Sequence, residues 1–140
     1  MTKVKIGKAE YSIYFAMQPT VQSGILKQLA KIDTSTDFDA GKVGELLSTM
    51  TELLLVGLQK FHSDKFGYNT LTGEGKEEAL AKAYDLMDDI AMSEDDGKEN
   101  PYFDLYAKLQ TELLENGFFA KMFRQEQENA EKAEAEQDQK

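Results

Sequence analysis

The sequence predicts a mainly α fold: a small bundle of about four helices with an N-terminal β-hairpin and a disordered acidic C-terminal tail. The first fifteen residues alternate between apolar and polar types, as strands do, whereas apolar residues recur every three or four positions over the next hundred. Residues 124–140 contain no hydrophobic side chain larger than alanine. We therefore expect a single helical domain over residues 1–123, with the hairpin in residues 1–16, and a Glu/Gln-rich flexible tail over residues 124–140.

The N-terminal segment has the pattern of two short strands. Its apolar positions alternate with lysine, serine and tyrosine; they are Val4, Ile6, Tyr11, Ile13 and Phe15. The turn is expected near Gly7 to Ala9, because glycine adopts positive φ without steric cost. A lone hairpin is marginally stable in water, so its apolar face must pack on the helices.

Four amphipathic helices are expected after the hairpin. The first covers Pro19 to Ile32, with proline in its first turn and an apolar face formed by Val21, Ile25, Leu29 and Ile32. The second, Val43 to Phe61, has the clearest periodicity and should be the most buried. The third covers Lys76 to Met92 after a glycine-rich reversal over 63–75, and the fourth begins at Pro101. The apolar face of the third is expected to consist of Leu80, Ala83, Tyr84, Met87, Ile90 and Ala91.

Short polar segments are expected to cap these helices. Asp39 can cap the second helix, with Phe38 packing on Val43 as a hydrophobic staple. Asn100 can cap the fourth helix, and Asn116-Gly117 can end it.

Composition excludes several classes of function. The 140 residues include no cysteine and carry a net charge of -10, which disfavours thiol chemistry, nucleic-acid binding and anionic membranes. The longest apolar stretch, Leu53 to Leu58, is far shorter than the roughly 20 residues of a membrane span. No nucleic acid and no membrane are expected as partners, and a cytoplasmic protein is expected.

Known catalytic and metal-binding motifs are absent from the sequence. The acidic clusters around Asp33 to Asp39 and Glu94 to Asp96 lack the glycine or the alternation of a calcium loop, so they are expected to be solvated loops. Asp85, Asp88 and Asp89 should occupy a solvated helix face. His62 is interpreted as a helix C-terminal residue. We therefore expect no enzyme, no cofactor and no metal.

The segment Phe118 to Phe123 concentrates three aromatic residues and a methionine beside the acidic tail. These side chains either close the core or remain available to a partner. The candidate partner-binding residues are Phe118, Phe119, Met122 and Phe123.

The chain resembles the tail assembly chaperones of long, non-contractile-tailed bacteriophages of Gram-positive hosts. The resemblance is carried by Lys3-Val4-Lys5-Ile6-Gly7, by Glu10-Tyr11 and Phe15, by the small helical body, and by Gly117-Phe118-Phe119 before a Glu/Gln-rich tail.

The resemblance implies a non-enzymatic protein that binds the tape measure protein, keeps it soluble, and is absent from the mature virion. A tape measure protein exposes long apolar helical faces, which suit a partner with an apolar groove. Many copies along one ligand would favour weak self-association. The resemblance also implies a longer frameshifted form that recruits the tail tube protein, and a location in the cytoplasm of the bacterial host.

An alternative from a different class is an acidic, nucleic-acid-mimicking inhibitor of a DNA-binding enzyme. This alternative is suggested by the net charge of -10. Mimicry requires carboxylates spaced along a surface as phosphates are, whereas much of the excess acid lies in predicted loops and in the tail.

Overall fold

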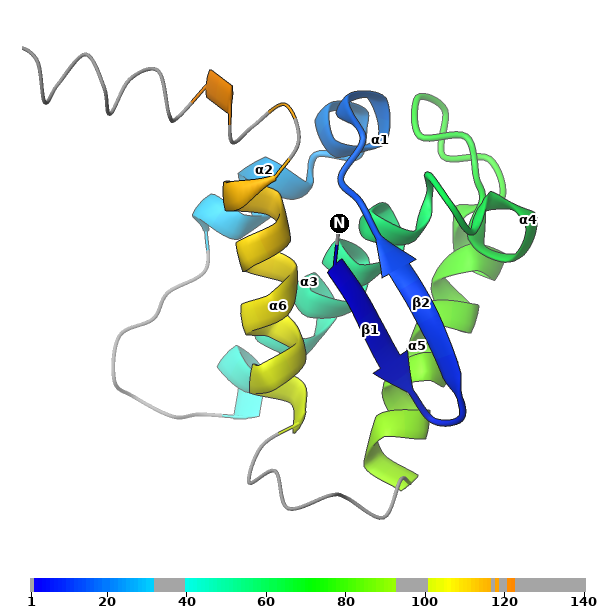
Figure 1. Ribbon diagram of the computed structural model, residues 1–140, viewed down its shortest axis with the longest axis vertical. Helices are drawn as coiled ribbons and strands as arrows, with labels where there is room; N and C mark the ends of the chain where they lie inside the picture. The colour runs from blue at the N-terminus through cyan, green and yellow to red at the C-terminus, as the bar shows by residue number, and fades with distance from the viewer. Residues whose placement is uncertain (1, 32–39, 93–100, 117, 119–120, 123–140) are drawn as a thin grey trace, which may run out of the picture.

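The computed structural model describes residues 2–31, 40–92, 101–116, 118 and 121–122 (Figure 1). They form a mainly helical structure with an N-terminal two-stranded hairpin, which confirms the predicted fold class. In chain order the elements are β1 (Thr2–Ile6), β2 (Ala9–Ile13), α1 (Met17–Gln22), α2 (Ile25–Ala30), α3 (Ala40–Leu58), α4 (Ser63–Phe66), α5 (Lys76–Met92) and α6 (Pro101–Glu115).

The hairpin forms as predicted. β1 and β2 pair antiparallel, with Ile6 opposite Ala9 beside a two-residue turn. Gly7 occupies the first turn position at φ 63°, where a side chain would be strained. Alternation then directs one face of the hairpin onto the helices, and this face buries Val4, Ile6, Ile13 and Phe15.

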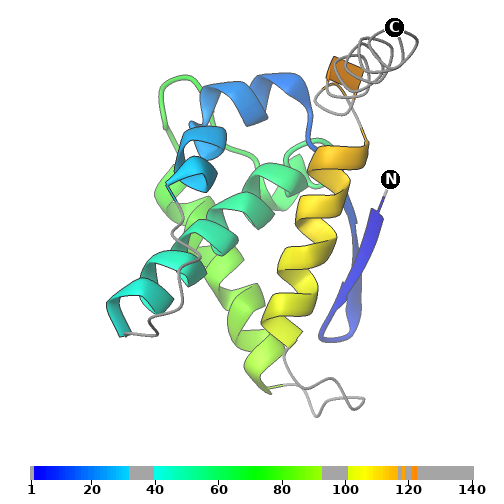
Figure 2. The same ribbon diagram turned by 90° about the vertical axis from the view of Figure 1, so that its left-hand side faces the viewer.

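Helix α3 is the centre of the structure. It contacts β2 and every other described helix (Figures 1 and 2). The predicted core position of this helix is therefore confirmed over its C-terminal half, which buries Met50, Leu53, Leu54, Leu55, Val56 and Leu58. The prediction was wrong at Phe61, because α3 ends at Leu58 and the Phe61 side chain is half exposed.

The helix expected over Pro19 to Ile32 is divided into α1 and α2. Gly24 separates them at φ 77°, a left-handed conformation that interrupts a helix. Thr20 and Ile25 on either side of the break are buried, whereas Val21, which was predicted to be buried, is 58% exposed.

Helix α5 has the predicted bounds, Lys76–Met92. Its buried face is shifted from the predicted one, since Ala79 and Leu86 are buried while Tyr84 and Ala91 are exposed. The extra helix α4 was not predicted; it buries Phe66, and the Gln59 Nε2 group donates a hydrogen bond of 2.7 Å to the Phe66 carbonyl.

Helix α6 packs beside β1 and places a carboxylate in the core. Glu112 is 1% exposed, and its Oε2 accepts hydrogen bonds from Thr2 Oγ1 at 2.6 Å and Asn116 Nδ2 at 2.8 Å. Its Oε1 is buried and accepts no hydrogen bond from the described residues. Leu105, Leu109 and Leu113 complete the buried face of α6.

Several predicted features lie outside the described residues. These are the caps at Asp39 and Asn100, the staple residue Phe38, the acidic clusters at 33–39 and 94–96, and the tail at 124–140. Among the helices that are described, none combines the length and the apolar character needed to cross a membrane.

Candidate partner-binding surface

The structure describes two of the four predicted partner-binding residues. Phe118 is helical and partly buried, and Met122 is helical and 63% exposed. Phe119 and Phe123 lie outside the described residues. The segment was predicted either to close the core or to remain available to a partner. The Met122 side chain is exposed at the surface and is therefore not part of the core.

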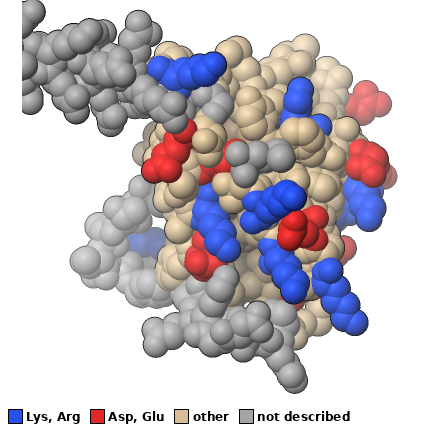
Figure 3. Space-filling view, in the orientation of Figure 1, with Lys and Arg blue, Asp and Glu red and all other residues tan. Residues whose placement is uncertain are grey.

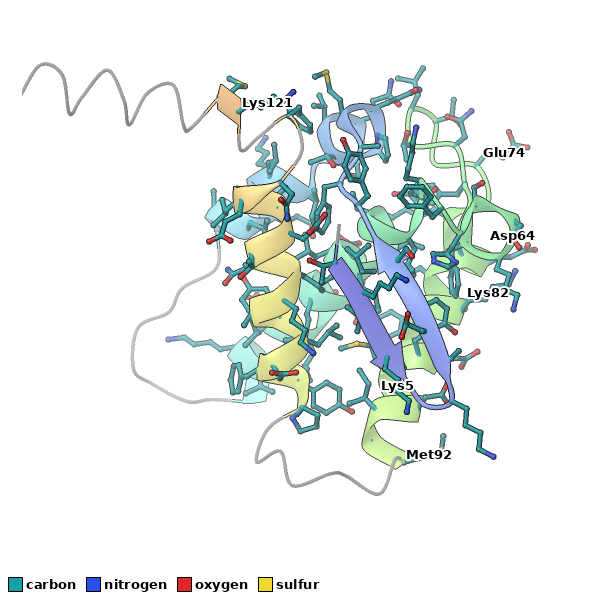
Figure 4. All side chains as sticks on the ribbon, viewed as in Figure 1. Lys5, Asp64, Glu74, Lys82, Met92 and Lys121 are labelled. Carbon is teal, nitrogen blue, oxygen red and sulfur yellow. The ribbon has the colours of Figure 1, made fainter. Side chains whose placement is uncertain are left out.

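Lys121, the residue before Met122, lies at the end of the molecule that also carries α1 and the loop over 67–75 (Figures 1 and 4). Nine large hydrophobic side chains of the described residues are exposed, and six of them belong to segments at or near this end. We call these six the α1-end surface: Met17, Val21, Phe61, Leu71, Leu114 and Met122.

Helix α1 contributes two residues to the α1-end surface, because residues four apart lie on the same side of a helix. Met17 and Val21 are four residues apart and so lie on one side of the helix, while Thr20 is fully buried. The Gln22 side chain accepts a hydrogen bond of 2.8 Å from Thr70 Oγ1, which ties the 67–75 loop to α1. Leu71, the residue after Thr70, is thereby held near α1.

The loop that carries Leu71 is internally ordered. The Asn69 side-chain oxygen accepts hydrogen bonds of 3.0 Å from the backbone N–H groups of Leu71 and Thr72. Gly73 and Gly75 both adopt φ 83°, which closes the loop before α5. Leu71 is therefore presented to solvent by a defined turn.

Phe61 is positioned by the chain that leads from β2 into α1. Its ring meets that of Tyr14 edge to face, with centroids 6.3 Å apart. The Tyr14 N–H in turn donates a hydrogen bond of 3.1 Å to the Gly57 carbonyl of α3. This arrangement fixes Phe61 beside the start of α1.

His62 follows the end of α3, as predicted, and its backbone N–H donates a hydrogen bond of 2.9 Å to the Leu58 carbonyl, but its side chain has a different role. Its Nε2 accepts a hydrogen bond of 2.9 Å from the Ser12 N–H of β2, and its ring packs edge to face on Tyr11. The imidazole therefore fastens the outer edge of β2 and does not interact with the last carbonyls of a helix.

The charge of the chain is distributed unevenly. The described residues contain 13 Asp and Glu against 12 Lys and Arg, whereas the whole chain has 26 against 16. Almost all of the net charge of -10 therefore belongs to the segments outside the description. Within the described residues, no group of three His, Cys, Asp or Glu side chains is arranged to hold a metal ion.

The three aspartates of α5 occupy the predicted solvated face. Asp85 and Asp88 are exposed and Asp89 is partly buried.

Of the α1-end surface, sequence reasoning identified only Met122 and missed Met17, Val21, Phe61, Leu71 and Leu114. Val21 was assigned to a buried stripe that depended on one continuous helix. Gly24 within that predicted helix was the available indication of a break. The residues around Leu71 show no pattern that predicts its exposure. Its position follows from the loop turn and from the hydrogen bond between the neighbouring Thr70 and Gln22 of α1.

Comparison of the chain with protein-family models, with curated proteins and with solved structures finds no match.

Proposed function

We propose that this protein is a phage tail assembly chaperone that binds the tape measure protein and keeps it soluble. The observation that carries the proposal is the α1-end surface, whose six exposed apolar side chains belong to segments at or near one end of the molecule (Figure 1). Exposed apolar groups gathered at one place are typical of protein-binding sites, whereas single ones are common everywhere.

The chemistry of this surface suits an amphipathic helix. Methionine, leucine and phenylalanine side chains are adaptable in shape, and such surfaces accept apolar helical faces by packing without directional bonds. A tape measure protein with long apolar helices would be such a ligand. The proposed site of action is the cytoplasm of the bacterial host, before the virion is complete.

The distribution of charge favours this proposal over the acidic inhibitor. A nucleic-acid mimic needs a folded surface rich in carboxylates, whereas the described residues are close to electrically neutral. Recruitment of the tail tube protein through a longer frameshifted form, and weak self-association along the ligand, remain parts of the proposed role.

The test is co-expression with the tape measure protein encoded in the same genome. We expect the tape measure protein to become soluble and to co-purify with several copies of this chain. Pull-down and the soluble fraction, each with and without this chain, measure both effects. A tape measure protein that stays insoluble and unbound would contradict the proposal.

The double variant Val21→Ser with Met122→Ser tests the surface itself. Both side chains are exposed, so the fold should be retained while solubilisation is lost. The matched control is Met92→Ser, since Met92 is 73% exposed and lies at the opposite end from Lys121 in Figure 4. Equal loss in the control would exclude the α1-end surface as the binding site.

A further inference from the structure

The outer edge of β1 has backbone groups that pair with nothing else in the described structure. In an antiparallel pair, alternate residues direct their N–H and C=O groups away from the partner strand. Ile6 and Ala9 close the two-residue turn, so Lys3 and Lys5 occupy the outward positions of β1. The outward position of Ser12, opposite Lys3, is confirmed by its bond to His62.

The two edges of the hairpin differ. The outer edge of β2 is closed in part by His62, which accepts from the Ser12 N–H at 2.9 Å. Just beyond β2, the Gly57 carbonyl accepts from the Tyr14 N–H. Along β1, no hydrogen bond from another described element reaches the backbone of Lys3 or Lys5. β1 is therefore the edge at which an additional strand can pair.

The solvent face of the hairpin is basic. Lys3, Lys5 and Lys8 are exposed on the hairpin, whose one carboxylate within residues 2–13, Glu10, forms an exposed ion pair of 3.7 Å with Lys3. Asp89 of α5 lies beside the turn, where its Cβ is 3.9 Å from the position a Cβ of Gly7 would take. In Figure 3, Lys and Arg side chains gather over the hairpin, and Figure 4 shows Lys5 near its turn. This local excess of positive charge stands out in a chain with a net charge of -10.

We propose that the β1 edge binds an extended acidic segment of a partner protein by strand addition. Lys3 and Lys5 supply two N–H donors and two carbonyl acceptors for main-chain pairing. Their side chains, with Lys8, attract carboxylates that alternate along the incoming strand. The same lysines oppose pairing with a second β1, because like charges would then face one another.

The experiment uses the full chain, labelled with ¹⁵N, and the synthetic peptide Thr-Glu-Val-Glu-Val-Glu-Thr. We expect saturable binding that weakens with added salt, shifts in the Lys3 and Lys5 amide signals, and slower hydrogen exchange at both amides. The control peptides carry lysine in place of glutamate, or proline in place of valine, and neither should bind.

Two variants separate backbone pairing from charge. Lys5→Gln removes the charge but keeps the N–H, whereas Lys5→Pro removes both, at an outward position where proline leaves the β1–β2 ladder intact. Lys5→Pro should bind the peptide about threefold to tenfold more weakly than Lys5→Gln. Circular dichroism confirms that both variants are folded.

The proposal fails under several outcomes. Absence of peptide binding would overturn it, as would equal affinities of Lys5→Gln and Lys5→Pro, which would reduce the effect to unspecific charge attraction. Concentration-dependent self-association that slows exchange at the Lys5 amide would assign the edge to a second copy and also overturn it. These readouts are independent of tape measure binding at the α1-end surface.

Discussion

Gly57 of α3 lies against Ile13 of β2 so closely that a Cβ atom at Gly57 would be 2.8 Å from Ile13 Cγ2. The same atom would lie 3.2 Å from the Phe15 ring. The Gly57 carbonyl also accepts the Tyr14 N–H at 3.1 Å. The hairpin therefore approaches the central helix through the one residue type that leaves room for it.

We expect Gly57→Ala to lower the free energy of unfolding by about 1–3 kcal/mol, because overpacking against Ile13 exceeds the gain in helix propensity. Gly44→Ala is the matched control, since it lies in the same helix with nothing within 4 Å of the added Cβ. Gly44→Ala should raise stability by about 0.5–1 kcal/mol. Urea denaturation measures both, and equal effects would contradict the close approach.

The buried carboxylate of Glu112 makes its hydrogen bond from Thr2 more important than an exposed one. Thr2→Val should cost about 1–3 kcal/mol, because it leaves the buried Oε2 with one donor fewer. In a Glu112→Ala background the same change should cost less, since Thr2 then has no carboxyl oxygen to which it can donate. A double-mutant cycle by denaturant unfolding gives the difference, and additive effects would disprove the coupling.

Tyr102 is expected to make stability depend on alkaline pH. Burial, and secondarily the nearby charge of Asp88, raises the pKa of Tyr102 above the ordinary value of about 10. The folded state therefore favours the neutral phenol, whose O–H donates to the Met87 carbonyl at 3.0 Å. This contribution is complete below the unfolded pKa and is lost as pH rises through the folded pKa.

Tyr102→Phe should therefore be less stable than the natural chain at pH 7, by about 0.5–1.5 kcal/mol, and the difference should shrink above pH 10. Thermal unfolding between pH 7 and 11 measures the trend. A difference that stays constant over this range would show that ionisation of Tyr102 is not linked to folding.

The segment around Met122 should matter for binding more than for stability. Met122→Ala and Phe119→Ala should both weaken tape measure binding while leaving the melting temperature nearly unchanged. Met122 is 63% exposed, so its truncation removes little buried area. A large drop in melting temperature for Phe119→Ala would instead return that residue to the core.

Local sequence patterns predicted an element correctly where the residues that begin and end it lie within or next to that element. α5 matches its predicted range because glycines precede it, Glu77 and Glu78 begin it, and apolar residues recur every three or four positions. The hairpin was equally predictable, since alternation and Gly7 together determine its register.

The features that the sequence did not predict depend on contacts between residues far apart in the chain. α4 is only four residues long and depends on burial of Phe66 and on the Gln59 side chain, which lies in a different element. The break at Gly24 depends on a left-handed φ of 77°, which glycine adopts without strain, and it lies between the buried residues Thr20 and Ile25. Only part of the α1-end surface was predicted, since its remaining members come together through the fold.

The contacts of α3 with all other helices and with β2 bear on how the chain loses its structure. A bundle in which one helix is shared by every layer has no portion that could persist after that helix detaches. Unfolding should accordingly be a single cooperative transition. The amides of Met50 to Leu58 should then exchange with solvent only through global opening.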